Sequence, residues 1–179
     1  MRIFLALDTE THSIRNARMA QLGAVMADRN FDEVGSVSLR VAPSGWVMEE
    51  AATAVNGITQ ERAVRFGLPA KAVLLALVEM VKLCPYLIVY NHTFDGGVIR
   101  REIAALGSED PGLDRPGVRV IDVIKMGATL QEDGRYTKLL TLHKQLLGWD
   151  YPGAHDGLAD ARAALRCARK MLERHLWEL

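Results

Sequence analysis

The sequence predicts one α/β domain over residues 1–179, built on a five-stranded mixed sheet. Three strand-like segments occupy the first 41 residues, and the short loops between them favour antiparallel neighbours. Helical and strand-like segments then alternate, which is the pattern of strands added to a sheet through crossover helices. No repeat, low-complexity tract or linker interrupts the chain.

The first three strands differ in their polarity. The first is expected at Arg2–Asp8, a nearly continuous apolar run that stops at a carboxylate. The second is expected at Ala20–Asp28 and the third at Val34–Val41, where apolar and polar side chains alternate with period two. That alternation indicates a sheet with one face more exposed to solvent.

Helices begin after a break at Pro43-Ser44-Gly45. Short helices are expected over Ala51–Arg65, around an Asn56-Gly57 turn. Pro69 begins a clear helix, which ends at Cys84-Pro85. Its apolar stripe has the spacing of a buried helical face and consists of Val73, Leu74, Leu77, Val78 and Val81.

The second half of the chain continues the alternation. A strand at Tyr86–Tyr90 precedes a helix at Thr93–Leu106, and a loop at Ser108–Gly117 leads to a strand at Val118–Ile121 that ends at Asp122. The expected helices after this strand are Val123–Leu130, Lys138–Leu147 and a final one from about Gly157 to His175.

The composition excludes several classes of protein. The chain has 179 residues, 49% of them hydrophobic, with 22 basic and 22 acidic side chains. A chain of this length buries enough surface to fold without disulfides, so Cys84 and Cys167 are expected to be reduced core thiols. No apolar run approaches the ~20 residues of a membrane span, and we expect a cytoplasmic protein with no membrane partner. Zero net charge gives no general argument for nucleic-acid binding.

A first candidate site lies at the end of the first strand, in Asp8-Thr9-Glu10-Thr11. Alternate strand residues share a face, so Asp8 and Glu10 project in the same direction. Two adjacent carboxylates repel each other, and a bound cation is the simplest remedy. The alternative is a carboxylate pair that is solvated in a turn.

Two further acidic segments follow other elements. Asp95 lies in Asn91-His92-Thr93-Phe94-Asp95, directly after a strand, where it either caps the next helix or contributes to a site at the sheet edge. His155 and Asp160 lie in His155-Asp156-Gly157-Leu158-Ala159-Asp160, at the start of the last helix. A carboxylate beside the apolar stripe of that helix is costly unless it is paired.

These segments together resemble the DnaQ-like (DEDDh) family of 3′-5′ exonucleases. The motifs are DTET at 8–11, NHTFD at 91–95 and HDGLAD at 155–160, with support from QLGAV at 21–25, AVNGIT at 54–59 and VIDV at 120–123. The resemblance implies a ribonuclease H-like fold with three antiparallel and two parallel strands. The histidine five residues before Asp160 is similar to the histidine branch of the superfamily. His12-Ser13 replaces the Thr-Gly that often follows the first motif.

The resemblance also implies a mechanism with two Mg²⁺ or Mn²⁺ ions, which suit hard oxygen ligands. Asp8 is expected to contact both ions, Glu10 and Asp160 to complete the site of one, and Asp95 to support the other. His155 is expected to take the proton from the attacking water.

The implied substrate is the 3′ end of a single-stranded nucleic acid. Single-stranded DNA or a frayed 3′ end is the leading expectation, an RNA-trimming enzyme of the RNase T or oligoribonuclease type is the alternative, and a non-catalytic nucleic-acid or polymerase-binding module is a third hypothesis. A homodimer and a polymerase partner both stay open. Substrate contacts are expected at Thr9, Thr11, Asn91 and Phe94. Candidates for phosphate contact are Arg100, Arg101, Arg135, Lys138, Lys144 and Arg162.

Overall fold

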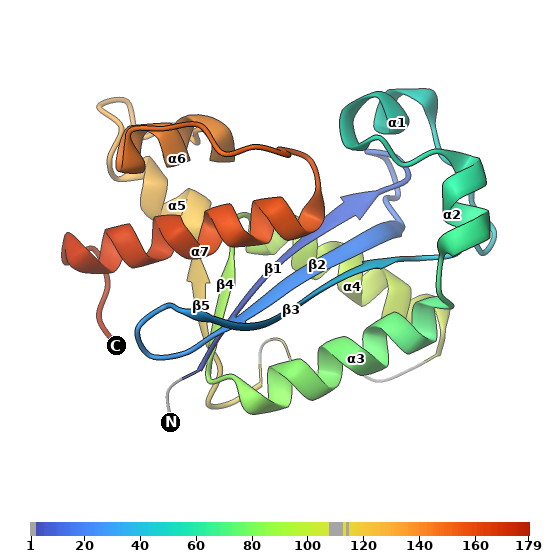
Figure 1. Cartoon of the computed structure of the whole chain (residues 1–179), viewed down its shortest axis with the longest axis horizontal. Coiled ribbons are helices and arrows are strands. Elements are labelled where there is room, and N and C mark those ends of the chain that lie inside the picture. Colours follow the sequence, from blue (N-terminus) through green and yellow to red (C-terminus); the bar gives the residue numbers. More distant parts are fainter. Residues whose placement is uncertain (1–2, 108–112, 114) are drawn as a thin grey trace.

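The computed structural model describes residues 3–107, 113 and 115–179, which form a five-stranded sheet with the order β3-β2-β1-β4-β5 (Figure 1). Neighbours β1, β2 and β3 are antiparallel, whereas β1 pairs in parallel with β4, and β4 in parallel with β5. The predicted mixed sheet is therefore confirmed. The strands are β1 (Phe4–Thr11), β2 (Met19–Ala27), β3 (Glu33–Arg40), β4 (Tyr86–Val89) and β5 (Arg119–Asp122).

Helices cover both faces of this sheet. The long helix α7 crosses one face, and α3 and α4 lie on the other, while α1 and α2 stand beyond the end of β1 (Figure 1). The helices are α1 (Glu50–Asn56), α2 (Gln60–Phe66), α3 (Ala70–Leu83), α4 (His92–Ala105), α5 (Val123–Ala128), α6 (Leu139–Leu147) and α7 (Gly157–Glu173).

The central strand β1 contributes side chains to two hydrophobic cores, because its side chains alternate between the two faces of the sheet. Leu5 and Leu7 belong to the core under α3 and α4. Phe4 and Ala6 belong to the core under α7. All four side chains are almost fully buried, so this strand is covered on both faces as a central strand of a parallel or mixed sheet should be.

The first strand extends further than its apolar run indicates. It was expected to stop at Asp8, but the ladder with β2 continues through Thr9, Glu10 and Thr11, with a register shift between the last two. The polar residues of the first motif therefore lie on a regular strand and not in a turn. The other element boundaries differ from expectation by one or two residues. Of the expected Ser108–Gly117 loop, residues 108–112 and 114 lie outside the described residues.

The two cysteines lie in the hydrophobic cores. Cys84 and Cys167 are both free and buried, as predicted for core thiols. Burial raises the thiol pKa to about 11 for Cys84 and to about 12 for Cys167, which makes both thiols unreactive.

Within residues 3–107, 113 and 115–179, none of the helices has the length and apolar character to cross a membrane.

Candidate functional site

Four acidic side chains from three elements converge at one edge of the sheet. Asp8 and Glu10 project from the C-terminal half of β1. Asp95 lies in the first turn of α4, and Asp160 lies in the first turn of α7. The parallel pairing of β1 with β4 brings the end of β1 next to the start of α4, since α4 follows β4 directly. The sheet topology thus assembles residues that are up to 152 positions apart.

Close contact between β2 and α7 completes this edge. Asp8 pairs with Gly23 on β2, and a Cβ atom on Gly23 would lie 2.0 Å from the carbonyl carbon of Gly157. Only glycine permits that approach. Gln21, two residues earlier on β2, accepts a hydrogen bond from the Gly157 N–H at 3.1 Å and donates to Asp156 at 3.0 Å. β2 therefore fixes the start of the helix that carries Asp160.

The carboxylates of β1 have strongly perturbed acidity. Burial raises the pKa of Asp8 well above its usual range, and the negative charges of Asp95, Asp160 and Glu10 raise it further. For Glu10, burial and then the charges of Asp160 and Asp95 raise the pKa to about 8. The neighbours that act on these two groups most strongly are themselves acids, so protein cations do not neutralise the cluster.

Asp95 is held by the first strand. Its Oδ1 accepts a hydrogen bond from the Thr9 N–H at 2.9 Å and another from the Thr9 hydroxyl at 2.7 Å. Both bonds favour the ionised form, yet burial dominates and raises the pKa of Asp95 to about 7, with a contribution from the charge of Asp122. Asp122 ends β5 beside this carboxylate and forms an ion pair with Lys125 at 3.1 Å.

Asp160 has two hydrogen-bond donors from the preceding loop. The Tyr151 hydroxyl donates to its Oδ1 at 2.6 Å, and the backbone N–H of His155 donates to its Oδ2 at 3.2 Å. Burial nevertheless raises the pKa of Asp160, against the effect of these bonds and of the His155 side chain. The loop therefore orients the Asp160 carboxylate toward β1 without supplying a fixed counter-charge.

His155 joins the carboxylates through an exposed loop. Its backbone has a φ of 68°, in the left-handed region that L residues other than Asn, Asp and His seldom occupy. One ring nitrogen and one carboxylate oxygen each from Glu10 and Asp160 lie within 4.8 Å of one another. Carboxylate oxygens are the ligands that Mg²⁺ or Mn²⁺ prefers, and a divalent cation would stabilise the ionised form of these crowded carboxylates. The five predicted site residues are thus brought to one place.

The other predicted contact residues line the same edge in different ways. Asn91 caps α4 by accepting a hydrogen bond from the Phe94 N–H at 3.2 Å, so its side-chain oxygen already has a structural role. The ring of Phe94 is 38% exposed, which favours a contact surface over a core position. Thr11 donates its hydroxyl to the carbonyl of Ser13 at 2.8 Å and thereby shapes the start of the β1–β2 loop.

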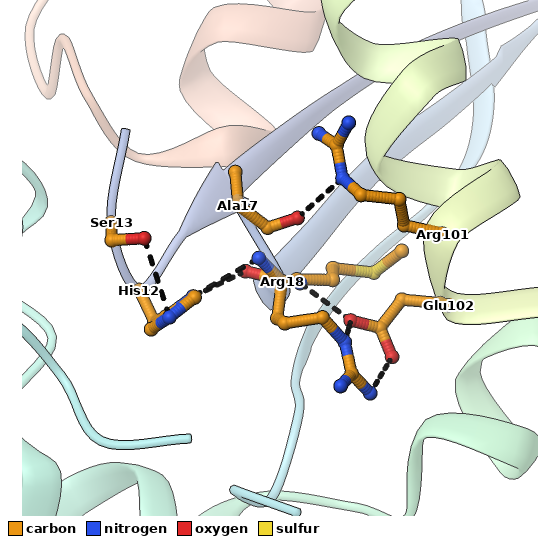
Figure 2. Close-up of polar contacts among 7 residues, drawn as sticks. His12, Ser13, Ala17, Arg18, Arg101 and Glu102 are labelled. Atoms are coloured by element: carbon orange, nitrogen blue, oxygen red, sulfur yellow. Dashed lines mark hydrogen bonds and ion pairs between the residues drawn. The ribbon is translucent and has the colours of Figure 1, made fainter. Parts of the chain in front are cut away.

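The loop between β1 and β2 is fixed to the helix that carries Asp95 (Figure 2). Arg18 donates from Nε and Nη2 to the two carboxylate oxygens of Glu102 on α4, at 2.7 and 3.0 Å. Glu102 is fully buried and also accepts from the Met19 N–H at 2.8 Å. Arg101 donates to the carbonyl of Ala17 at 2.9 Å. One helix therefore positions both Asp95 and the loop that follows Glu10.

The family model described as Exonuclease (RNase_T) matches residues 5–168 of the chain. This match covers every element from β1 into the last turns of α7. The chain belongs to the RNase T exonuclease family. The resemblance to the DnaQ-like branch and the ribonuclease H-like fold are confirmed with it.

Solved structures of exonuclease I share the fold of this exonuclease-family domain. One structure of exonuclease I, discussed for its processivity, superposes with a TM-score of 0.84 at 22% identity and covers 98% of this chain and 42% of its own. Exonuclease I of Escherichia coli in complex with a dT13 oligonucleotide gives 0.82 at 21% identity over 97% and 42%. The enzyme of Methylocaldum szegediense gives 0.80 at 23% over 98% and 41%. The chain thus spans less than half the length of these structures, and no curated protein sequence matches it.

Three residues of this RNase T-family site were not singled out from the sequence. Gln21 fixes the start of α7, and Tyr151 orients Asp160. Asn56, the last residue of α1, donates to the carbonyl of Thr11 at 3.1 Å, and its hydrogen bond to Glu10 lowers the pKa of that carboxyl against the effect of burial. Gln21 and Asn56 fall in the QLGAV and AVNGIT segments that support the resemblance, which was the available signal. No comparable segment contains Tyr151.

Proposed function

We propose that this domain is a metal-dependent 3′-5′ exonuclease that releases nucleoside monophosphates from the 3′ end of single-stranded DNA or of frayed DNA. The observation that supports it is the cluster of Asp8, Glu10, Asp95 and Asp160, with His155 beside it, in a chain of the RNase T exonuclease family. Four carboxylates that repel one another at one end of the strands destabilise the fold. Such a cluster is expected at a functional site, and a phosphodiester hydrolase that binds divalent cations requires it.

Each acidic residue has a role in this proposal. Asp8, whose pKa is raised by burial and by the charges of the other three, would hold both metal ions, Glu10 and Asp160 would complete one metal site, and Asp95 would support the second. Two such ions, when bound, lower the barrier by activating water and by neutralising charge on the phosphodiester and its leaving oxygen. The residues of the chain supply the geometry: Tyr151 and the His155 backbone hold Asp160 in place.

His155 would act as the general base. Neutral imidazole accepts a proton at physiological pH, and an exposed loop lets the ring approach an attacking water and then release the proton to solvent. A ring nitrogen of His155 lies within 4.8 Å of a carboxylate oxygen of Glu10 and of Asp160, which is consistent with a base beside these carboxylates. Thr9, Thr11, Asn91 and Phe94, at the end of β1 and the start of α4, would contact the terminal nucleotide.

The test is degradation of 5′-labelled single-stranded DNA and of RNA of the same sequence, in Mg²⁺, in Mn²⁺ and in EDTA. We expect a ladder that shortens from the 3′ end in Mg²⁺ or Mn²⁺ and no degradation in EDTA. Asp8→Asn and Asp160→Asn should remove the activity. Glu79→Gln is the matched control, because Glu79 is an exposed acid of α3 that pairs with Lys82, on the opposite face of the sheet from α7 (Figure 1).

The outcomes separate the three hypotheses. Faster degradation of RNA than of DNA identifies the RNA-trimming alternative. Binding of the oligonucleotide without degradation in either metal identifies a non-catalytic module. Internal cleavage, activity in EDTA, or unimpaired degradation of an oligonucleotide blocked by a 3′-phosphate contradicts the proposed exonuclease.

A further inference from the structure

A cavity of about 590 Å³ opens from the candidate site toward α5 and α6. Asp8, Asp160 and His155 form one end of it. Tyr151, which holds Asp160, also lines it, and most of the remaining wall is the segment from Tyr136 to Leu140, before and within the first turn of α6, which the proposed function does not use. Thr9, Thr11, Asn91 and Phe94 do not line this cavity, so it lies apart from the contacts proposed for the terminal nucleotide.

The walls of the cavity are apolar and partly aromatic. Ile124 on α5 and Leu139 and Leu140 on α6 contribute aliphatic surface, and Leu140 is 39% exposed. Tyr136 lines the cavity and is 65% exposed, so its side chain is accessible to a ligand. An exposed ring beside aliphatic side chains is a surface on which a planar, uncharged group can stack.

The segment that carries Tyr136 is fixed to the sheet. The hydroxyl of Tyr90, the residue after β4, donates a hydrogen bond to the carbonyl of Thr137. Tyr136 and Lys138 flank this anchored residue, and Lys138 is exposed at the cavity wall. The cavity thus has an anionic end at the carboxylates and a cation next to an aromatic ring further along the wall.

The proposed substrate has a part that matches this arrangement. A phosphodiester held at the carboxylates carries one nucleoside on each side, and the residues of β1 and α4 account for only one of them. The second nucleoside, on the side of the leaving 3′-oxygen, offers a flat base and a further phosphate. A cavity of this volume has room for one such unit, because pockets for ligands of similar size measure roughly 300–1,000 Å³.

We propose that this cavity is the subsite for the penultimate nucleotide, in which the base stacks on Tyr136 and the phosphate on its 5′ side contacts Lys138. The inference rests on the proposed function and adds the residues that hold the leaving strand. Stacking on Tyr136 requires a base that is free of its complementary strand, so the same ring selects single-stranded over paired 3′ ends.

The test compares three variants on a single-stranded DNA oligonucleotide in Mg²⁺. Tyr136→Ala should raise KM roughly 5- to 150-fold, the effect expected for one lost base–aromatic stack. Tyr136→Phe keeps the ring and should retain the wild-type KM. Because Tyr136 is largely exposed, neither change removes core packing, and thermal unfolding of both variants checks this.

A second measurement tests whether Tyr136 contacts the penultimate nucleotide or the terminal one. Inhibition by a free deoxynucleoside 5′-monophosphate, which fills only the terminal-nucleotide site, should be the same in Tyr136→Ala as in the wild type. Lys138→Gln should lower the slope of log KM against log salt by about 0.7, the value for one phosphate contact on a single strand. Lys71→Gln is the matched control, since Lys71 is an exposed lysine on α3, across the sheet from the cavity.

The outcomes are distinct from those of the proposed function. An unchanged KM for Tyr136→Ala in an active enzyme, or an equal weakening of inhibition by the monophosphate, overturns the subsite alone. A wild-type protein that degrades no oligonucleotide overturns the proposed function and this subsite with it.

Discussion

The buried ion pair between Arg18 and Glu102 allows a quantitative prediction about stability (Figure 2). The carboxylate of Glu102 is fully buried, whereas the Arg18 side chain is 24% exposed. Removing Arg18 therefore leaves a charge without access to water, with the Met19 N–H as its remaining described donor. Removing the charge of Glu102 instead leaves a guanidinium that can reach solvent.

The two substitutions should thus differ in cost. Arg18→Met should lower the free energy of unfolding by about 3–5 kcal/mol, as expected for an uncompensated buried charge. For a chain of this length the melting temperature should fall by roughly 6–20 °C. Glu102→Gln keeps an acceptor for Met19 and should cost about 1.5–3 kcal/mol, the worth of hydrogen bonds to a charged group.

Chemical denaturation of the wild type, both single variants and the double variant Arg18→Met/Glu102→Leu measures these differences. The double variant should be more stable than Arg18→Met, because no buried charge remains. It should not reach the wild type, since the Met19 N–H loses its acceptor at a cost of about 1–3 kcal/mol. A loss below about 1 kcal/mol in Arg18→Met is the behaviour of a surface ion pair and would refute the reasoning.

Three further predictions concern the candidate site. The folded-state pKa values of about 8 for Glu10 and about 7 for Asp95 exceed those of unfolded carboxyls, so the folded metal-free chain binds more protons between about pH 4 and 8. Its melting temperature should therefore fall as pH rises from 5 to 8, with Mg²⁺ reversing most of the fall at pH 8; a metal-free melting temperature that rises over this range contradicts the assignment. Tyr151→Phe, which removes the 2.6 Å hydrogen bond to Asp160, should raise the Mg²⁺ concentration for half-maximal activity about 10- to 100-fold, as a metal titration of the rate will show. Gly23→Ala should lower the free energy of unfolding by about 3 kcal/mol or more in urea denaturation, because its Cβ would overlap the backbone at the start of α7; near-wild-type stability would mean that α7 can shift freely.

The sequence predicts the fold well because periodicity reports burial directly. Of the five residues predicted for the apolar stripe of α3, for example, Val78 is half-buried and four are buried: Val73, Leu74, Leu77 and Val81. The sequence predicts the end of β1 too early for a physical reason. A carboxylate after an apolar run indicates the end of a buried strand, but strand pairing depends on backbone partners, and β2 supplies them as far as Thr11.

The candidate site is less completely predictable. Its acids stand out in the sequence because Asp8 and Glu10 come at the end of the first apolar run, and Asp95 and Asp160 lie in the first turns of helices. The residues that hold these acids do not stand out in the sequence, because their partners are remote along the chain. Gln21, for example, donates a hydrogen bond to Asp156, which is 135 positions away. Nothing in the local pattern around a buried glutamine indicates such a contact. Tyr151 lies nine residues from Asp160, yet the bond between them depends on how the intervening loop folds.

The balanced charge of the chain has a different meaning once the acids are placed. The sequence contains 22 basic and 22 acidic residues, and four of the acids gather at one sheet edge. The rest of the sequence therefore has 22 basic residues against 18 acidic ones. On the proposed function, two divalent ions would offset the four negative charges of these carboxylates, where the phosphodiester must lie, and the formal charge of the chain would rise from zero to about +4. Affinity for a nucleic acid should consequently depend on the metal more than on the overall charge.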